Sequence, residues 1–361
     1  TKIKGDKKNS DFFFKYISEI YKFRKENKID LNIKNIHHFV IQTKSEFTVP
    51  LICEWLMQSP YNYKFSFVHE SKRHHVLRFT DQSPDILIQE NLSPEEDFIF
   101  HQNSLNPKSK INPKIKYVGE VFEVEDLKKL DRVFTSTQKV KFQNPLPDNY
   151  YEDYIHWTMP SVYTHNCIGY KQKPKKERTY LMDQEWNFDD EARARFKLSK
   201  DMFNNLSLNK YVLPIDHFAT RIYSHDRELA ILEYLTLTNY WFWGAYNIGD
   251  QNSSTNVCRN LQGDPESVSP AKVFTANNTP SFLSYLDGLP CPTENFVQLY
   301  GRRLHHFALG VTDGFIGDES KNYRNVDYVV DQLKNSHMQF LDHVIGSCQE
   351  GLKQIFSRKS H

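Results

Sequence analysis

Leu213-Pro214-Ile215-Asp216-His217-Phe218-Ala219-Thr220-Arg221-Ile222 is the stretch that decides the fold, and a related stretch, Leu304-His305-His306-Phe307-Ala308-Leu309-Gly310-Val311, follows later. Both are typical of strands, and both carry the order His-Phe-Ala. A helical pattern follows each of them, at 226–237 and 325–336. Short strands are expected after these helices, at 240–246 and 271–276 and at 338–340 and 351–356. The recurrence indicates duplicated βαβββ modules.

The first half of the chain repeats this order more weakly. Ile36–Thr43 is expected to be a strand, and Thr48–Gln58 a helix with Thr48 as its N-cap and Pro50 in its first turn. Strands are then expected at 63–69, 75–79 and 84–89. A second unit begins with a strand at 115–124 and a helix at 126–134.

These patterns predict an α+β fold in which tandem βαβββ modules form two domains. Residues 1–30 are expected to form an N-terminal helix and residues 31–143 the first domain. The periodicity is lost between residues 144 and 178, and residues 144–208 are predicted to be an irregular connector with a linking helix at 189–204. Residues 209–361 would form the second domain.

Composition narrows the class of protein. The chain has 361 residues and a formal net charge of +1, which gives no electrostatic support for binding nucleic acid or an anionic membrane. No apolar run approaches the roughly 18 residues of a membrane-spanning helix, so a soluble protein is expected. With 26 Phe and 20 Tyr, bulky rings are expected to build the core. Five scattered Cys without CxxC spacing indicate a reducing, cytoplasmic compartment.

His217 and His306 are the candidate metal ligands, because they occupy the same place in two modules. Strand alternation directs His217, Ala219 and Arg221 to one face, and small neighbours leave room for a ligand. Two imidazoles and one carboxylate form the facial triad of non-haem Fe(II) sites. The alternative is that both are hydrogen-bonded core histidines. His305 is expected to point to the opposite face, and His37-His38 is interpreted as structural.

Other residues give weaker signals. Lys272 and the pair Arg302-Arg303 could neutralise an acidic substrate, although such side chains are more often simply exposed. The aromatic run 240–243 could shape a ring-binding pocket, but is more typical of a core. No P-loop, GxSxG or GxGxxG motif is present.

The segments Ile215–Phe218, Leu304–Ala308 and Gly351–Ser357, in this order and spacing, resemble the C-terminal half of 4-hydroxyphenylpyruvate dioxygenase, of the vicinal oxygen chelate superfamily. The stretch from Glu294 to Gly301 is also similar. The first half resembles that family more faintly, through 36–39, 75–79 and 121–126. The resemblance covers most of the chain except residues 144–209.

The resemblance implies two vicinal-oxygen-chelate domains and an Fe(II) cofactor held by His217 and His306. It implies that Gln354, with Asn277 or Asn278, lines the substrate site, and that a 2-oxo acid and O₂ are the substrates. The family's third iron ligand is a Glu on a further strand, which this sequence does not show before it stops at His361. Glu350 does not match that Glu and is not assigned as a ligand.

Three functions follow as alternatives. The first is a 2-oxo acid dioxygenase that is similar to 4-hydroxyphenylpyruvate dioxygenase, with a hydroxymandelate-forming activity left open. The second is a non-catalytic protein of the same fold that binds a small ligand or a partner. The third is a metal-dependent isomerase or lyase of the same superfamily. Fold alone does not decide among them, and association into a homo-oligomer stays open.

Overall fold

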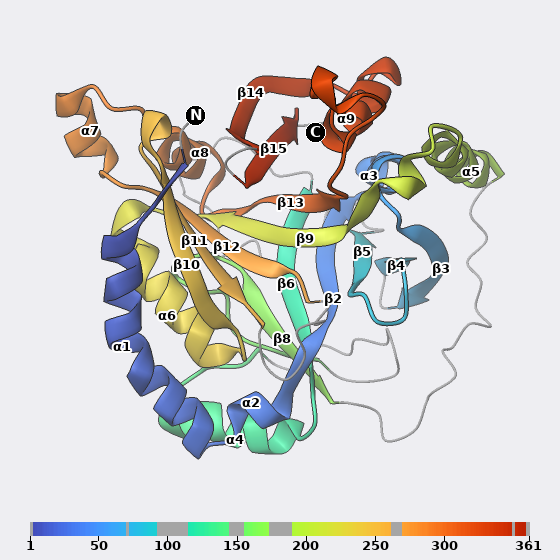
Figure 1. Cartoon of the computed structure of the whole chain (residues 1–361). Coiled ribbons are helices and arrows are strands. Elements are labelled where there is room, and N and C mark those ends of the chain that lie inside the picture. Colours follow the sequence, from blue (N-terminus) through green and yellow to red (C-terminus); the bar gives the residue numbers. More distant parts are fainter. Residues whose placement is uncertain are drawn as a thin grey trace.

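Two sheets organise the chain (Figure 1). The computed structural model describes residues 3–69, 72–91, 115–143, 155–172, 190–260, 269–348 and 351–358. Its first sheet has the order β3 (Asn62–His69), β4 (Lys72–Arg78), β5 (Asp85–Asn91), β2 (Ile33–Lys44), β6 (Ile115–Val124), β8 (Cys167–Gln172) and β7 (Ile155–Trp157). The second has the order β1 (Ile3–Gly5), β10 (Trp241–Ile248), β11 (Ser253–Arg259), β12 (Ala271–Asn277), β9 (Val212–Arg221) and β13 (Arg303–Val311). A separate hairpin pairs β14 (Phe340–Ser347) with β15 (Leu352–Ser357).

The helices lie on the outer faces of the sheets and at their ends (Figure 1). In the first half they are α1 (Lys7–Glu26), α2 (Ile29–Asn32), α3 (Ser45–Gln58) and α4 (Leu127–Thr137). The second half contains α5 (Asp190–Asn205), α6 (Arg227–Leu237), α7 (Ser281–Asp287), α8 (Pro292–Tyr300) and α9 (Asn325–Asn335). Among the described residues, no helix is long and apolar enough to cross a membrane.

Strand pairing confirms the predicted duplication. In the first sheet, β2 runs antiparallel to β6 and parallel to β5, which closes the unit β2-α3-β3-β4-β5. In the second sheet, β9 runs antiparallel to β13 and parallel to β12, which closes the unit β9-α6-β10-β11-β12. The fold is therefore α+β with tandem βαβββ-like modules, as expected.

Aromatic rings join the two halves, in agreement with the expected core. Phe39 on β2 is fully buried, and its ring centroid lies 5.0 Å from that of Phe218 on β9 and 5.2 Å from that of Phe307 on β13. These three rings come from the opening strands of three modules. The opening strands of these three modules therefore pack against one another through their aromatic side chains.

The prediction of an irregular connector at 144–208 is wrong in part. Residues 155–157 and 167–172 form β7 and β8, and β8 pairs in parallel with β6. The strands are short and lie next to turn residues, so their period of two is not visible in the sequence. The linking helix is present as α5. Residues 144–154 and 173–189 lie outside the described part of the chain.

Three further details correct the expectations. Helix α3 begins at Ser45, so Thr48 is inside the helix, where its hydroxyl bonds the Thr43 hydroxyl at 2.7 Å and is not an N-cap. Pro50 consequently lies in the second turn, where its missing N–H removes one helical hydrogen bond. Residues 253–259, where no strand was expected, form β11.

The N-terminal segment belongs structurally to the second sheet. Strand β1 pairs antiparallel with β10, and α1 packs along that strand (Figure 1). Arg24 on α1 is fully buried, pairs with Asp30 and donates to the carbonyl oxygens of Leu235 and Tyr240. The predicted helical segment at 1–30 is therefore attached to the half of the molecule that is most distant from it in sequence.

Candidate metal centre

His217 and His306 meet on one face of the second sheet. Strands β9 and β13 pair so that His306 lies opposite Ala219, and Ala308 lies opposite His217. The Nε2 atoms of the two imidazoles are 3.4 Å apart. Two nitrogens bonded at about 2.1 Å to one ion, with an angle of about 90° to 109° between the bonds, would be roughly 3.0 to 3.4 Å apart. The pair thus has the spacing of two adjacent metal ligands.

Each imidazole is held through its other nitrogen. Nδ1 of His217 lies 2.7 Å from Oδ2 of Asp216, so a protonated Nδ1 donates to the carboxylate and leaves the Nε2 lone pair available. Nδ1 of His306 lies 2.7 Å from Nδ1 of His305, and one of these two nitrogens must donate to the other. If His306 is the donor, its Nε2 is likewise available for a metal. Carboxylate or imidazole partners of this kind orient metal-bound histidines in many sites.

The position of His305 corrects the sequence-based expectation. His305 was expected on the opposite face, but a register shift between Leu304 and His306 makes it an extra residue in β13. Such a bulge interrupts strict alternation and lets neighbouring side chains approach each other. The ring of His305 therefore lies beside His306 and packs edge-on against Phe296 of α8, with centroids 4.9 Å apart.

Apolar rings and a cation surround the histidine pair. Phe356 on β15 packs edge-on against His306, with ring centroids 5.0 Å apart. Arg221, on the His217 face of β9, stacks over Phe296 at 5.0 Å. Burial lowers the pKa of Arg221 to about 10, which leaves it charged at neutral pH. Burial, followed by the nearby charge of Arg221, lowers the pKa of His305 to about 3.

The residues that were predicted to bind substrate do not all lie near the histidine pair. Gln354 lies on β15 two residues from Phe356, and alternation directs both side chains to the face that meets the histidines. Asn277 is fully buried at the end of β12, where its Oδ1 accepts from the N–H of Glu294 and its Nδ2 donates to Asn252. Asn278 is exposed. Ala271 is level with His217 in the sheet, so Asn277 lies about 20 Å further along the strand.

Asn277 thus serves the packing of α8 against β12. The amide fixes the start of α8, and the Glu294 carboxylate in turn accepts from the N–H groups of Ser224 and Ser281. This network therefore holds the end of β12, which carries Asn277, against the segment 294–301. A role of Asn277 or Asn278 toward substrate stays a prediction.

The histidine pair fits two coordination positions of one metal ion. No third protein ligand is found among the described residues. Across the described ranges, no group of three or more His, Cys, Asp and Glu side chains is placed to hold a metal ion. Glu350, which was not assigned as a ligand, lies outside the described residues. The carboxylate of Asp216 already accepts from Nδ1 of His217.

The first half carries a similar histidine pair. Nδ1 of His37 lies 2.8 Å from Nδ1 of His38 on β2, as in the His305-His306 pair on β13. Burial and the charges of Lys171 and Arg78 lower the pKa of His37 to about 3. The two pairs occupy equivalent opening strands, which supports the duplication and leaves His37-His38 interpreted as structural.

Comparison with known proteins supports the fold. A solved structure of a 4-hydroxymandelate synthase variant from Streptomyces coelicolor aligns over 86% of this chain and 77% of its own, with a TM-score of 0.51 and 14% identity. A xylose isomerase-like TIM barrel/4-hydroxyphenylpyruvate dioxygenase fusion protein aligns over 86% of this chain at 13% identity, with a TM-score of 0.48. This chain covers 40% of the fusion protein's length. No family model and no curated protein matches the sequence. The chain therefore shares the fold of this 4-hydroxymandelate synthase, as the first alignment shows.

Proposed function

We propose that this protein is a non-haem Fe(II)-dependent dioxygenase that acts on a 2-oxo acid, similar to 4-hydroxyphenylpyruvate dioxygenase. The observation that carries the proposal is the 3.4 Å separation of the Nε2 atoms of His217 and His306. Each imidazole is also oriented through Nδ1, by Asp216 or His305. A direct N–H···N hydrogen bond between the rings is the alternative, but its usual length is about 2.9 to 3.0 Å.

The side chains around the pair would serve binding and orientation. His217 and His306 would hold the iron, which supplies the redox chemistry when it is bound. Arg221 contributes positive charge that favours the carboxylate of an acid substrate. Phe356 packs against His306 and Phe296 packs against the neighbouring His305, and this apolar surface would help to exclude water from the pair. The amide of Gln354 would orient the bound acid by hydrogen bonds.

A second candidate is a non-catalytic protein of this fold that binds a small ligand or partner. One observation favours it: among the described residues, no carboxylate completes the histidine pair. The two candidates differ in one property that can be measured. Only the dioxygenase consumes O₂ in proportion to a 2-oxo acid.

The test is O₂ uptake by the anaerobically purified protein, given Fe(II) and a panel of aryl and alkyl 2-oxo acids. We expect substrate-dependent uptake that falls to background in His217→Ala and in His306→Ala. His225→Ala, a change at an exposed histidine, is the matched control and should retain activity. Iron binding without O₂ uptake would favour an isomerase or lyase, and failure to bind iron would favour the binding protein.

A further inference from the structure

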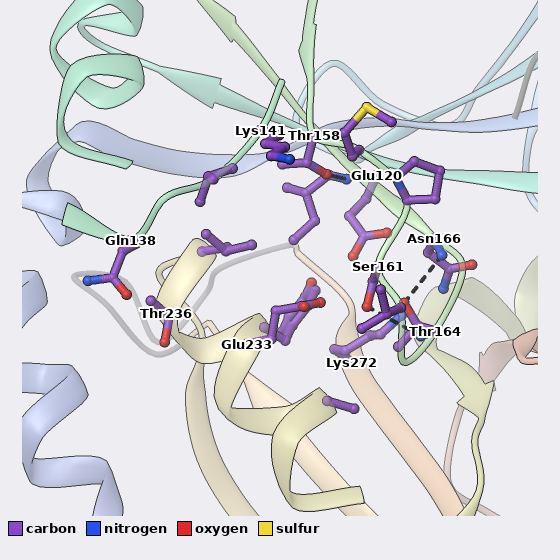
Figure 2. A pocket seen from close by; sticks show the side chains of 18 of the residues that line it. Glu120, Gln138, Lys141, Thr158, Ser161, Thr164, Asn166, Glu233, Thr236 and Lys272 are labelled. Carbon is purple, nitrogen blue, oxygen red and sulfur yellow. Dashed lines mark hydrogen bonds between the residues drawn. The ribbon is translucent and has the colours of Figure 1, made fainter. Parts of the chain in front are cut away.

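A cavity lies at the junction of the two halves, away from the histidine pair. Its volume is about 420 Å³, within the range of about 300 to 1,000 Å³ that is usual for small-molecule sites. Helix α6 and β12 of the second half form one wall, and residues 138–141 and 158–168 of the first half form the other (Figure 2). Junctions between domains are common places for such sites.

The cavity is separate from the metal centre because it lies against Lys272 and Phe274 of β12, on the opposite face of the second sheet. Lys272 lies beside Phe218 in the sheet, and its Nζ donates to Thr220 at 2.9 Å. Phe218 and Thr220 alternate with His217, Ala219 and Arg221, so they face away from the histidines. A ligand in this cavity would therefore not touch His217 or His306.

The floor of the cavity has its own balanced charges. Lys272 and Glu120 are each 1% exposed, and the carboxylate of Glu120 acts on the ammonium of Lys272. The Lys272 ammonium also lies 4.5 Å from the ring centroid of Phe218 and 5.3 Å from that of Phe274. The hydroxyl of Tyr117 donates to Glu120 at 2.5 Å. These contacts already satisfy both charges, so an acidic ligand gains little from Lys272.

Glu233 is the remaining acid of the cavity wall. It lies half-buried on α6 and faces Ser161 across the cavity (Figure 2). Burial raises its pKa, partly offset by a hydrogen bond from Ser161. Within the described part of the cavity lining, no lysine or arginine forms an ion pair with Glu233, whereas Glu120 and Lys272 lie close enough for their charges to interact. A cation beside Glu233 would favour the ionised form of the carboxylate, which burial disfavours.

Apolar side chains supply the rest of the wall, and two exposed lysines, Lys139 and Lys141, stand at its rim. The apolar lining residues are Val140, Met159, Pro160, Val162, Ile168, Ala230, Leu237 and Phe274. Lys139 is directed away, because its ammonium donates to the carbonyl of Ser136 at 2.9 Å. The interior thus combines one acid that lacks a cation with an apolar surface.

We propose that this cavity binds a small organic amine, whose ammonium pairs with Glu233 and whose apolar body packs between Val162 on one side and α6 on the other. The carboxylate of Glu233, which forms no ion pair with a described lysine or arginine, selects the amine over the corresponding acid. Neither the histidine pair nor a bound metal takes part. The proposal stands independently of the dioxygenase function.

Calorimetric titration with 2-phenylethylamine tests the proposal, with 3-phenylpropionate and 2-phenylethanol as the matched acid and alcohol. We expect the amine to bind at least about tenfold more tightly than either analogue, since one desolvated ion pair contributes more than about 1.4 kcal/mol. Glu233→Gln should remove this preference. Glu228→Gln, on the same helix but paired with Arg227, is the matched control and should retain it.

Two further variants test whether the amine binds in this cavity and whether binding is independent of the histidine pair. Val162→Trp enlarges a 65% exposed side chain at the mouth, so it should block the amine without disturbing the core. The double variant His217→Ala/His306→Ala should bind the amine normally. Equal binding of acid and amine, absence of amine binding at millimolar concentration, or loss of binding only in the histidine variant would each overturn the proposal.

Discussion

The imidazole of His217 is fixed by a single carboxylate, and this gives Asp216 a role that its exposed position does not suggest. Asp216 precedes His217 on β9 and accepts from Nδ1 at 2.7 Å. The hydrogen bond, followed by the charge of His217, keeps the pKa of Asp216 below its usual value despite some opposing burial. A carboxylate in this position selects the tautomer whose Nε2 can bind a metal.

We therefore expect Asp216→Asn to weaken Fe(II) or Co(II) affinity about 10- to 100-fold, because the amide holds the imidazole less firmly and does not favour that tautomer. Competition with a chelating dye measures the affinity. Asp250→Asn, at an exposed position near β11, is the control. An unchanged affinity in Asp216→Asn would show that the carboxylate does not position a ligand.

The buried side chain of Lys116 leads to a prediction about how folding stability depends on pH. This side chain of β6 is 4% exposed, and burial lowers its pKa from 10.5 to about 7. Between about pH 7 and 10.5 the unfolded chain binds the proton and the folded chain does not, so this group makes stability rise with pH there. Below about pH 7 both states are protonated, and the cost of burying the charge is fully present.

Lys116→Met should remove this dependence. Relative to wild type, the variant should gain about 2–3 kcal/mol more stability at pH 6 than at pH 9. Urea unfolding at the two pH values measures the difference, and Lys128→Met, at an exposed position of α4, is the control. A difference between variant and wild type that does not change with pH would contradict the buried, deprotonated lysine.

Residue types allowed part of the site to be predicted. The His-Phe-Ala recurrence correctly indicated the shared face of His217 and His306, because a regular strand has a strict period of two. The place of His305 was not predictable from that period, because it depends on a bulge in β13 that has no residue signature. Glu233 was not singled out either, since its partners come from loops far away in sequence.

At the scale of elements, β8 shows what the periodicity misses. It is a short strand that pairs in parallel with β6, and it completes the second module of the first sheet. Gly119 of β6 faces Cys167 of β8 so closely that a Cβ atom there would lie 1.9 Å from the Cys167 carbonyl oxygen. The two backbones can therefore approach only because residue 119 is a glycine.

Gly119→Ala should destabilise the protein by about 3 kcal/mol or more, because the contact involves backbone that cannot rotate away. Gly244→Ala is the matched control, since it also changes a strand glycine but a Cβ there meets nothing within 4 Å. Chemical unfolding of both variants measures the cost. Equal stability of the two variants would show that β6 and β8 do not pair as described.

At the scale of the whole molecule, the aromatic contact among Phe39, Phe218 and Phe307 joins the two halves, and we expect them to unfold together. The modules and their order could be predicted from sequence because each opening strand is strongly patterned. Their mutual packing could not, because it depends on contacts such as Phe39 with Phe307, between residues far apart in the chain. The attachment of α1 to the second sheet was missed for the same reason.

Phe39→Ala should cost about 3–5 kcal/mol of stability, as for other buried rings. Because the ring touches both halves, far-UV circular dichroism and tryptophan fluorescence should report the same shifted unfolding transition. Phe282→Ala removes a ring that is 70% exposed and is the control. Two separate transitions in the wild-type protein would show that the halves fold independently.

The central claim is that His217 and His306 bind one metal ion together, and anaerobic metal titration tests it most directly. Co(II) added to the metal-free protein should bind at one equivalent and produce visible d–d absorption. Binding should be lost in His217→Ala and in His306→Ala, and retained in His225→Ala. Absence of stoichiometric binding by the wild-type protein, or binding that survives both alanine changes, would contradict the account.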